Sequence, residues 1–350
     1  MRFYALETAP VTVSNGTAST PAGIMSSTGS TVGTGRYWTS FPNGSFDAKA
    51  QDIVFDMQIV PANNPSGATI ISVHGVSIED LRQAKNFKGS TLSLTAGMQG
   101  GLPLSANQPK PELLITSTVF GAFGNWEGTE QTLDFVVIPS LYTDENPGNI
   151  VFSWSPGQTF TEAITATLSR AYPASTVSVT VNPSLSLPSN QSVLHKSSTS
   201  TGLAHFIHRL TYGALGQSYH GVKIYFVGSQ ITVTDYSSST SPVVTLKFTD
   251  LIGQPTWLDP PVLTINTILR ADIKIGGYIK LPVKDIPGPG SVLTSPTISG
   301  AVFSNKVNFS GTFVVVSIRA VGQFRGTGAD SWLTVIQAVP VAAQSSGGPL

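Results

Sequence analysis

Residues 113–128 read LLITSTVFGAFGNWEG, and residues 311–326 read GTFVVVSIRAVGQFRG. Each stretch is an apolar run followed by a glycine-rich turn, and each precedes a second apolar run, TLDFVVI at 132–138 or SWLTVIQA at 331–338. The turns AFGNWEG and AVGQFRG align at an offset of 198 residues, with three of seven positions identical. A solenoid repeats at about 20 to 50 residues, so this offset predicts two related β domains that flank an insert. Chance resemblance between two glycine-rich hairpins is the alternative interpretation.

The repeat marks six turn residues as structural positions and as candidate interface positions: Gly124, Trp126, Gly128, Gly322, Phe324 and Gly326. Three copies of a chain with two such domains would present six similar domains in a ring. Such a ring can match a six-fold partner on one side and a three-fold partner on the other. The repeat therefore indicates a symmetry adaptor within an assembly.

The composition argues against several classes of protein. Nineteen Lys and Arg balance nineteen Asp and Glu among 350 residues, so a polybasic nucleic-acid binder is not indicated. The 34 glycines and 24 prolines favour a turn-rich β protein. The absence of cysteine excludes disulfides, zinc–thiolate sites and cysteine nucleophiles. The first ten residues, MRFYALETAP, lack the apolar centre of a signal peptide, and no run could span a bilayer, so we expect a soluble protein that does not insert into membranes.

Alternating apolar residues predict the strands. In DIVFDMQIV at 52–60, every second residue from Ile53 to Ile59 is apolar, which is the pattern of a strand with one buried face. Similar runs occur in both halves of the chain, at 69–73, 91–96, 113–120, 132–138, 243–248, 273–281, 312–321 and 332–338. The sequence thus predicts a mainly β protein with two related tube-like β-barrel domains.

Capping signals predict three helices. Ser77 and Asp80 have the spacing of an N-cap and an N3 acid, and a short helix here would lie across a barrel mouth. Thr159 and Glu162 form a capping box that opens a helix over 159–171. A third helix is expected over 202–210, capped by Ser200 or Thr201. With strands at 177–181, 223–227 and 231–234, the last two helices predict a small α+β insert.

Five regions follow from these patterns. We expect an extended Ser/Thr/Gly-rich arm over 1–45, a first barrel domain over 46–145, the α+β insert over 146–240, a second barrel domain over 241–340 and a polar tail over 341–350. Trp38 and Phe41 in the arm are candidate interface anchors, with ordinary packing as the alternative.

No established catalytic motif is present. His205 and His208 lie three residues apart on the third helix, flanked by His195 and His220, but no third ligand is suitably spaced, so a polar helix face is favoured over a metal site. Glu127 and Glu130 lie beside Trp126, an arrangement that could bind or cleave a glycan. The second turn carries Arg325 where the first carries Glu127, which favours a charged hairpin tip. We therefore expect no enzyme, no cofactor and no metal.

The order of these patterns resembles the baseplate hub proteins of contractile bacteriophage tails over roughly residues 52–338. ATIISVHGVSIEDLRQAKNFKGSTLSLTAGMQGGLP, at 68–103, and the first glycine-rich turn are similar to the first hub domain. FSWSPGQTFTEAITATLSRAYP, at 152–173, is similar to the helical insert of hub proteins. LIGQPTWLDPPVLTINTILRADIKIGGYIKL, at 251–281, and the second turn with its flanking strands are similar to the second hub domain.

The resemblance implies a homotrimer whose six tube-like domains form a pseudo-hexameric ring. Such a ring would join the hexameric tail tube to the trimeric central spike and enclose the channel used in genome ejection. The implied partners are the tail tube protein, the central spike protein, other baseplate proteins, the tape-measure protein in the lumen and, transiently, DNA. The expected location is the virion baseplate after synthesis in the host bacterial cytoplasm. The alternatives are a tail-associated glycan-binding or glycan-cleaving protein and a capsid or tube subunit.

Overall fold

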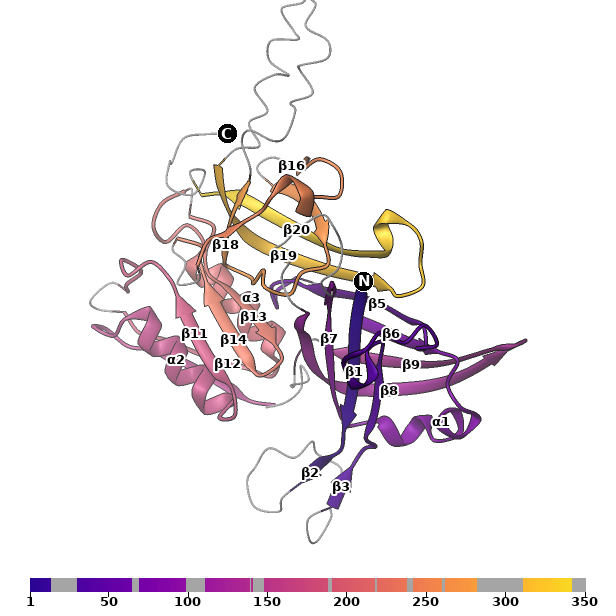
Figure 1. The fold of residues 1–350 in the computed structure, drawn as a ribbon. Coiled ribbons are helices and arrows are strands. Elements are labelled where there is room, and N and C mark those ends of the chain that lie inside the picture. The colour runs from indigo at the N-terminus through magenta and orange to yellow at the C-terminus, as the bar shows by residue number, and fades with distance from the viewer. Residues whose placement is uncertain are drawn as a thin grey trace, which may run out of the picture.

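A computed structural model of the chain describes residues 1–13, 30–64, 69–98, 111–138, 140, 148–187, 191–217, 219–237, 242–259, 262–281 and 311–341. The protein is mainly β, as predicted, and the described strands form one large sheet and three small ones. Figure 1 shows how these strands are arranged. The predicted tail over 342–350 and most of the predicted arm, 14–29, lie outside the described residues.

The large sheet contains two sets of five strands. The first repeat consists of β5 (Ile53–Ile59), β6 (Thr69–His74), β7 (Thr91–Met98), β8 (Glu112–Glu127) and β9 (Glu130–Ile138). The second repeat consists of β16 (Thr256–Asp259), β17 (Val262–Ile268), β18 (Tyr278–Leu281), β19 (Gly311–Gln323) and β20 (Trp332–Pro340). The spatial order is β5-β6-β9-β8-β7 in the first and β16-β17-β20-β19-β18 in the second, and every neighbouring pair is antiparallel. The two halves therefore have the same strand connectivity, as the sequence repeat predicted.

Local details confirm the equivalence. The pairing of β8 with β9 shifts between Val119 and Gly121, and that of β19 with β20 shifts between Val315 and Ser317, so each long strand contains a bulge. The Val119 carbonyl accepts from Gly89 N at 2.9 Å, and the Val315 carbonyl accepts from Gly276 N at the same distance. Both glycines have positive φ, 83° and 71°, which a residue with a side chain rarely adopts. Val119 and Val315 thus occupy the same place in the two repeats.

This pairing corrects the register predicted from sequence. Val119 and Val315 are separated by 196 residues in the numbering, whereas the turns align in sequence at an offset of 198. The structural and sequence alignments differ by two residues, and side chains alternate between the faces of a sheet with a period of two. Both alignments therefore assign each residue of the hairpin to the same face. The hairpins are equivalent, but Trp126 lies in the place of Gly322 and not of Phe324.

The two repeats join edge to edge. Residues Ile318–Gln323 of β19 pair with Val54–Ile59 of β5 in antiparallel register, and we call this pairing the internal joint. Arg319 donates to both Asp56 oxygens across it, at 2.7 and 2.5 Å. Among the described strands the path has two ends, β16 and β4 (Arg36–Thr39). The expected closed barrels are therefore wrong for the described residues, since β5 continues into the other repeat instead of closing its own.

The N-terminal segment is part of the sheet. β1 (Arg2–Ala9) pairs with β7, and β4 pairs with β1, while β2 (Val11–Val13) and β3 (Ser30–Val32) form a separate ribbon. The prediction of an arm outside the compact fold is wrong for the strands β1 and β4. Leu6 and Tyr4 of β1 are fully buried, because they lie on the face of the strand that packs on the core of the first repeat.

The insert forms a separate layer beside the second repeat (Figure 1). α2 (Phe160–Ala171) and α3 (Ser200–Thr211) pack with the pair β10 (Ile150–Trp154) and β12 (Val193–Ser197) and with the sheet of β11 (Thr176–Thr180), β14 (Gln230–Thr234) and β13 (Lys223–Val227). The capping box of Thr159 and Glu162 is present, whereas α3 is capped by Thr199 instead of Ser200 or Thr201. Tyr225 of β13 donates to the carbonyl of Val316, the bulge residue of β19, at 2.9 Å, which attaches the insert to the second repeat.

Short elements complete the fold. They are η1 (Pro42–Gly44), α1 (Ile78–Arg82), η2 (Ala84–Phe87), β15 (Val244–Thr245), η3 (Phe248–Asp250) and η5 (Ala329–Ser331). Ser77 caps α1 by accepting from Asp80 N, as predicted. α1 lies against β8 and β9, and β15 pairs with β18 in parallel. No helix in the described part of the chain is long and apolar enough to cross a membrane.

Candidate assembly surface

The hairpin of β19 and β20 is covered by the first repeat and the N-terminal strand. The ring of Phe324, just beyond β19, lies 5.0 Å from that of Tyr4, 6.3 Å from that of Phe46 and 6.5 Å from that of Trp332. The Arg2 guanidinium donates to the carbonyls of Gln323 and Phe324, at 2.8 and 3.0 Å, and to that of Gly326. These contacts fix the tip of the second hairpin within the chain.

The hairpin of β8 and β9 projects from the sheet and is exposed (Figure 1). Trp126 is 62% exposed, and its indole nitrogen donates to the Gly128 carbonyl of its own turn at 2.9 Å. Phe123 is 57% exposed on the same strand, and the bulge residue Phe120 is exposed as well. Three large apolar side chains on one strand are costly to leave in water, so they indicate a contact surface.

The backbone edges of the two long strands, β19 and β8, also differ in whether another strand pairs with them. Beyond the bulge, β19 pairs with β20 on one side and with β5 on the other, and Phe324 N continues the joint by donating to the Ile53 carbonyl at 3.0 Å. Beyond its own bulge, β8 pairs with β9 on one side only. In the described part of the chain, no backbone hydrogen bond is made to its other edge over Phe120–Glu127. This edge is the place where, by analogy with β19, another strand would bind.

A second open edge lies at the far end of the large sheet. β16 is the last strand of the path and pairs with β17 only, among the strands that the structure describes. It is the counterpart of β5, the strand that makes the internal joint in the first repeat. Trp257 and Leu258 of β16 are 37% and 64% exposed. Among the described strands, β16 and the part of β8 beyond its bulge therefore each keep one edge unpaired outside the internal joint.

The predicted glycine positions have different structural roles. A Cβ at Gly322 would lie 2.2 Å from the Phe55 ring, and one at Gly124 would lie 2.8 Å from the Leu81 carbonyl oxygen of α1. Gly128 has a φ of 60° in the two-residue turn between β8 and β9, and a Cβ at Gly326 would meet the Ser331 side chain at 2.6 Å. The four glycines therefore serve close packing or turn geometry.

The two predicted interface anchors differ in exposure, since Trp38 is buried and Phe41 is partly buried. Trp38 of β4 is buried between Phe87 and Phe135, with ring centroids 6.3 and 5.8 Å away, in the core of the first repeat. Phe41 packs on Phe3 and Phe46 at 5.4 and 5.6 Å. Ordinary packing, the alternative interpretation, accounts for Trp38, because β4 is a strand of the sheet. The role of Phe41 as an interface anchor stays a prediction.

The acidic pair near Trp126 does not line a cleft. Glu127 and Glu130 lie opposite each other across the turn that ends the hairpin, and both are exposed. Glu130 Oε2 lies 3.5 Å from His74 Nδ1. A glycosidase needs carboxylates on both sides of a bound sugar, whereas these two lie at the exposed end of one hairpin. The geometry fits the charged hairpin tip that the sequence favoured.

The histidines of the insert do not form a metal site in the described residues. His208 Nε2 lies 3.2 Å from Lys223 Nζ, and His195 stacks on Phe206 with ring centroids 3.7 Å apart. Burial first, and then the Lys223 charge, lower the pKa of His208 below its ordinary value. The neutral ring is therefore favoured, and it serves the packing of α3 against β13.

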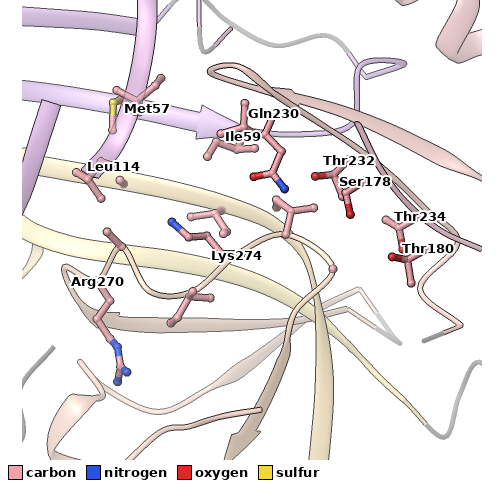
Figure 2. Close-up of a pocket in the computed structure, with 18 residues that line it drawn as sticks. Met57, Ile59, Leu114, Ser178, Thr180, Gln230, Thr232, Thr234, Arg270 and Lys274 are labelled. Atoms are coloured by element: carbon pink, nitrogen blue, oxygen red, sulfur yellow. The ribbon is translucent and has the colours of Figure 1, made fainter. Parts of the chain in front are cut away.

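A cavity of about 200 Å³ lies where the insert meets both repeats (Figure 2). One wall carries hydroxyl and amide side chains of the insert sheet, and the other carries apolar side chains of β5, β8 and β19. Its charged lining residues are Arg270 and Lys274, and none of the described lining residues is a carboxylate or a histidine. The lining therefore offers no general acid–base pair of the kind that hydrolysis uses.

Comparisons with family models and with curated proteins found no match. Among solved structures, a tail protein from Neisseria meningitidis MC58 has a TM-score of 0.47 and 11% identity, covering 96% of each chain. The 43 kDa tail protein of prophage MuSo2 from Shewanella oneidensis has a TM-score of 0.45 and 11% identity, covering 84% of this chain and 98% of that one. An E. coli component of the type VI secretion system has a TM-score of 0.45 and 10% identity, covering 86% of this chain and 76% of that one. Scores and identities this low do not assign a function to the chain.

Sequence reasoning found the projecting hairpin but missed the residues that carry its exposed surface. Phe123 and Leu258 were not singled out, because alternation shows which face of a strand is buried and not which edge is unpaired. The signal that could have identified Leu258 is the comparison of repeats, since β16 corresponds to β5.

Proposed function

We propose that this chain is the subunit of a trimeric baseplate hub in a contractile bacteriophage tail, where it joins the hexameric tail tube to the trimeric central spike. The observation that carries the proposal is the pair of repeats with identical strand connectivity, joined edge to edge by β19 and β5. Among the described strands, β16 and the part of β8 beyond its bulge each keep one edge unpaired. The sequence resemblance to hub proteins supports the same assignment.

The open edges favour a ring. A donor strand and an acceptor edge on different surfaces make a head-to-tail contact, which closes into a ring when the rotation per subunit divides a full turn. Three chains bring six equivalent repeats together, which suits a six-fold tube on one face. Each chain carries one insert and one N-terminal ribbon, so a trimer has three of each and presents three-fold symmetry to a trimeric spike.

The proposed role is structural and not enzymatic. The acidic pair lies at the exposed end of a hairpin, and the cavity lacks a carboxylate among its described lining residues. The channel through the ring would contain the tape-measure protein and then the passing DNA. A formal net charge of zero suits a passage that must release DNA, because little counterion-driven attraction results.

The proposal places the protein in the virion, in the tail baseplate, after synthesis in the bacterial cytoplasm. Its partners would be two further copies of the chain, the tail tube protein, the central spike protein and neighbouring baseplate proteins. Tail proteins and a type VI secretion component among the similar structures are compatible with this setting.

The test is electron microscopy of the purified protein, alone and mixed with the tube and spike proteins of the same virus, without imposed symmetry. We expect particles with three-fold symmetry and six lobes around an open channel, which add to one end of a tube and to one spike. A chain that stays monomeric with both partners present, or that forms long filaments or shells, would contradict the proposal.

A further inference from the structure

We propose that the cavity between the insert and the two repeats binds an acylated amino acid with an aliphatic side chain, either free or as the last residue of a peptide. Such a ligand carries a carboxylate, an amide and a hydrocarbon side chain around one carbon atom. Each of these three groups has a counterpart in the cavity lining (Figure 2). The site lies within a single chain, so the inference goes beyond the proposed assembly and does not depend on it.

The polar wall of the cavity follows from the strand pattern of the insert. Residues 176–180 read TVSVT and residues 230–234 read QITVT, so polar and apolar side chains alternate along β11 and β14. The two strands pair in parallel, with Ser178 beside Thr232. Their valine and isoleucine side chains belong to the core that the insert forms with α2 and α3. The polar side chains therefore lie on the other face of the sheet, where they line the cavity.

Most of these polar side chains have no partner in the part of the chain that the structure describes. Thr234 Oγ1 accepts a hydrogen bond from Tyr236 N at 2.9 Å. No hydrogen bond to another described residue is made by the other four polar side chains of the wall, Ser178, Thr180, Gln230 and Thr232. Half-buried hydroxyl groups are normally hydrogen-bonded, so the wall needs an occupant with hydrogen-bonding groups. An amide supplies both a donor and an acceptor.

The opposite wall is apolar and includes the internal joint. Met57 of β5 pairs with Ala320 of β19, and Ile59 pairs with Ile318, and all four residues line the cavity. Leu114 of β8 extends this wall (Figure 2). None of the described lining residues is aromatic, so the lining offers no ring on which a sugar could stack. The wall suits an aliphatic side chain, which it would remove from water.

The charge in the lining is positive. Arg270 is already paired with Asp250 and Asp272, and Figure 2 shows its guanidinium directed away from the other labelled side chains. Lys274 has no carboxylate partner among the described residues, and it is exposed, so a ligand that enters from solvent can meet its amine. A carboxylate accepts hydrogen bonds from a lysine amine and from the amide of Gln230, which also lines the cavity.

The size of the cavity limits the ligand. A cavity of about 150 Å³ in a protein core holds a molecule of the size of benzene. The cavity of about 200 Å³ therefore accommodates roughly ten non-hydrogen atoms, which is close to the size of acetylleucine or acetylvaline. Small-molecule sites typically combine an apolar lining with a few polar groups that fix orientation, and this cavity has that composition.

A ligand series tests the proposed chemistry on the purified full chain. Acetyl-leucine should bind with a dissociation constant of about 0.1 to 1 mM by isothermal titration calorimetry and should raise the unfolding temperature. Acetyl-leucinamide, which lacks the negative charge, and acetylglycine, which lacks the aliphatic side chain, should each bind about tenfold more weakly. Acetyl-Gly-Gly-Leu distinguishes the two sources of the ligand. Its binding would assign the site to a peptide end, and binding of acetyl-leucine alone would assign it to a free acylated amino acid.

Variants test whether binding occurs in this cavity. Lys274→Gln should weaken acetyl-leucine binding about tenfold and leave acetyl-leucinamide binding unchanged, because only the carboxylate uses the amine. Lys280→Gln is the matched control, since Lys280 is an exposed lysine of β18 outside the cavity lining, and it should have no effect. Ser178→Leu should fill the space between the walls and abolish binding. Thermal unfolding without ligand checks that each variant folds.

The outcomes separate this inference from the proposed function. Absence of binding at 10-fold above the expected dissociation constant would overturn the inference, as would equal binding of acetyl-leucine and acetyl-leucinamide. Binding that is the same in the Lys274→Gln variant would overturn it too, since the ligand would then lie elsewhere. None of these results bears on the trimer, which electron microscopy tests independently.

Discussion

The hairpins β8–β9 and β19–β20 share their strand order, their bulge and their glycine-rich turn, yet one is covered and the other is exposed. Phe324 beyond β19 is enclosed by three aromatic rings of the same chain, whereas Trp126 at the end of β8 lies mostly in solvent. The difference shows that the local sequence determines the form of a hairpin but not which other strands and side chains pack against it. What is missing at the first hairpin is supplied at the second by β5 and the N-terminal strand.

The largest effect on stability is expected at a buried ion-pair cluster in the second repeat. Arg270, between β17 and β18, is 8% exposed and donates to Asp250 and Asp272 at 3.0 and 2.6 Å. Burial alone would lower the pKa of Arg270, but the hydrogen bonds and charges of both carboxylates raise it above its ordinary value. Arg270→Met should lower the unfolding free energy by about 3 kcal/mol, since it leaves a buried carboxylate unpaired.

The comparison change is Arg36→Met in β4, which removes a more exposed pair with Asp80 of α1 at 2.8 Å. It should cost no more than about 1 kcal/mol. Urea unfolding of the monomer, followed by tryptophan fluorescence, compares the two variants. Equal losses of unfolding free energy in the two variants would contradict the expectation that the buried ion pairs contribute more to stability than the exposed one.

Close packing at Gly322 gives the next largest effect. A Cβ there would overlap the Phe55 ring, so Gly322→Ala should destabilise the protein by about 2 to 3 kcal/mol. Adding Phe55→Leu should recover part of the loss. Gly35→Ala is the control, because its nearest atoms lie 3.5 Å from the added carbon and the change should be nearly neutral. An unaffected Gly322→Ala variant, by urea unfolding, would argue against the internal joint as described.

The two tip aromatics should differ in what they stabilise. Phe324→Ala removes contacts within the chain and should cost about 2 kcal/mol of monomer stability, because the ring is only partly buried. Trp126→Ala should change monomer stability by less than about 0.5 kcal/mol. Thermal unfolding at low protein concentration measures both. A similar loss in the two variants would mean that Trp126 packs within its own chain.

The smallest effect is expected at the ion pair of the internal joint. Arg319 and Asp56 are about half exposed, so the pair should contribute about 0.5 kcal/mol and weaken with added salt. A double-mutant cycle of Arg319→Ala and Asp56→Ala measures the coupling between the two side chains. A coupling that does not respond to salt would place the pair in a less solvated joint than the structure shows.

The positions of many strands and helices were readable from the sequence. The alternation in 52–60 predicted β5, and the capping pairs at Ser77 and Thr159 predicted the starts of α1 and α2. The repeat predicted two equivalent hairpins, and the structure extends the equivalence to five strands each. Local signals of this kind are set by hydrophobic period and by side-chain capping.

Long-range pairing was not readable. The arm prediction failed because Ser/Thr/Gly-rich composition around residues 14–35 concealed β1 and β4, whose burial depends on β7. Closed barrels were predicted for each half, but the edge of β5 pairs with β19 instead. The sequence alignment of the two turns is displaced by two residues from the structural one, because it was based on identical residues in glycine-rich turns. The bulges that define the structural correspondence leave no mark in the sequence.

The internal joint also constrains how the chain folds during synthesis. β5 ends at Ile59 and its partner segment begins at Ile318, so the ribosome must add 259 residues after Ile59 before Ile318 is made. At about 5 to 20 residues per second this takes roughly 13 to 50 s. Throughout that interval β5 presents an unpaired edge, on which Asp56 and Gln58 are exposed in the finished fold. Polar side chains on an unpaired strand edge disfavour pairing with a neighbouring nascent chain. Asp56 and Gln58 would therefore protect the edge of β5 from such pairing until β19 has been synthesised and pairs with it.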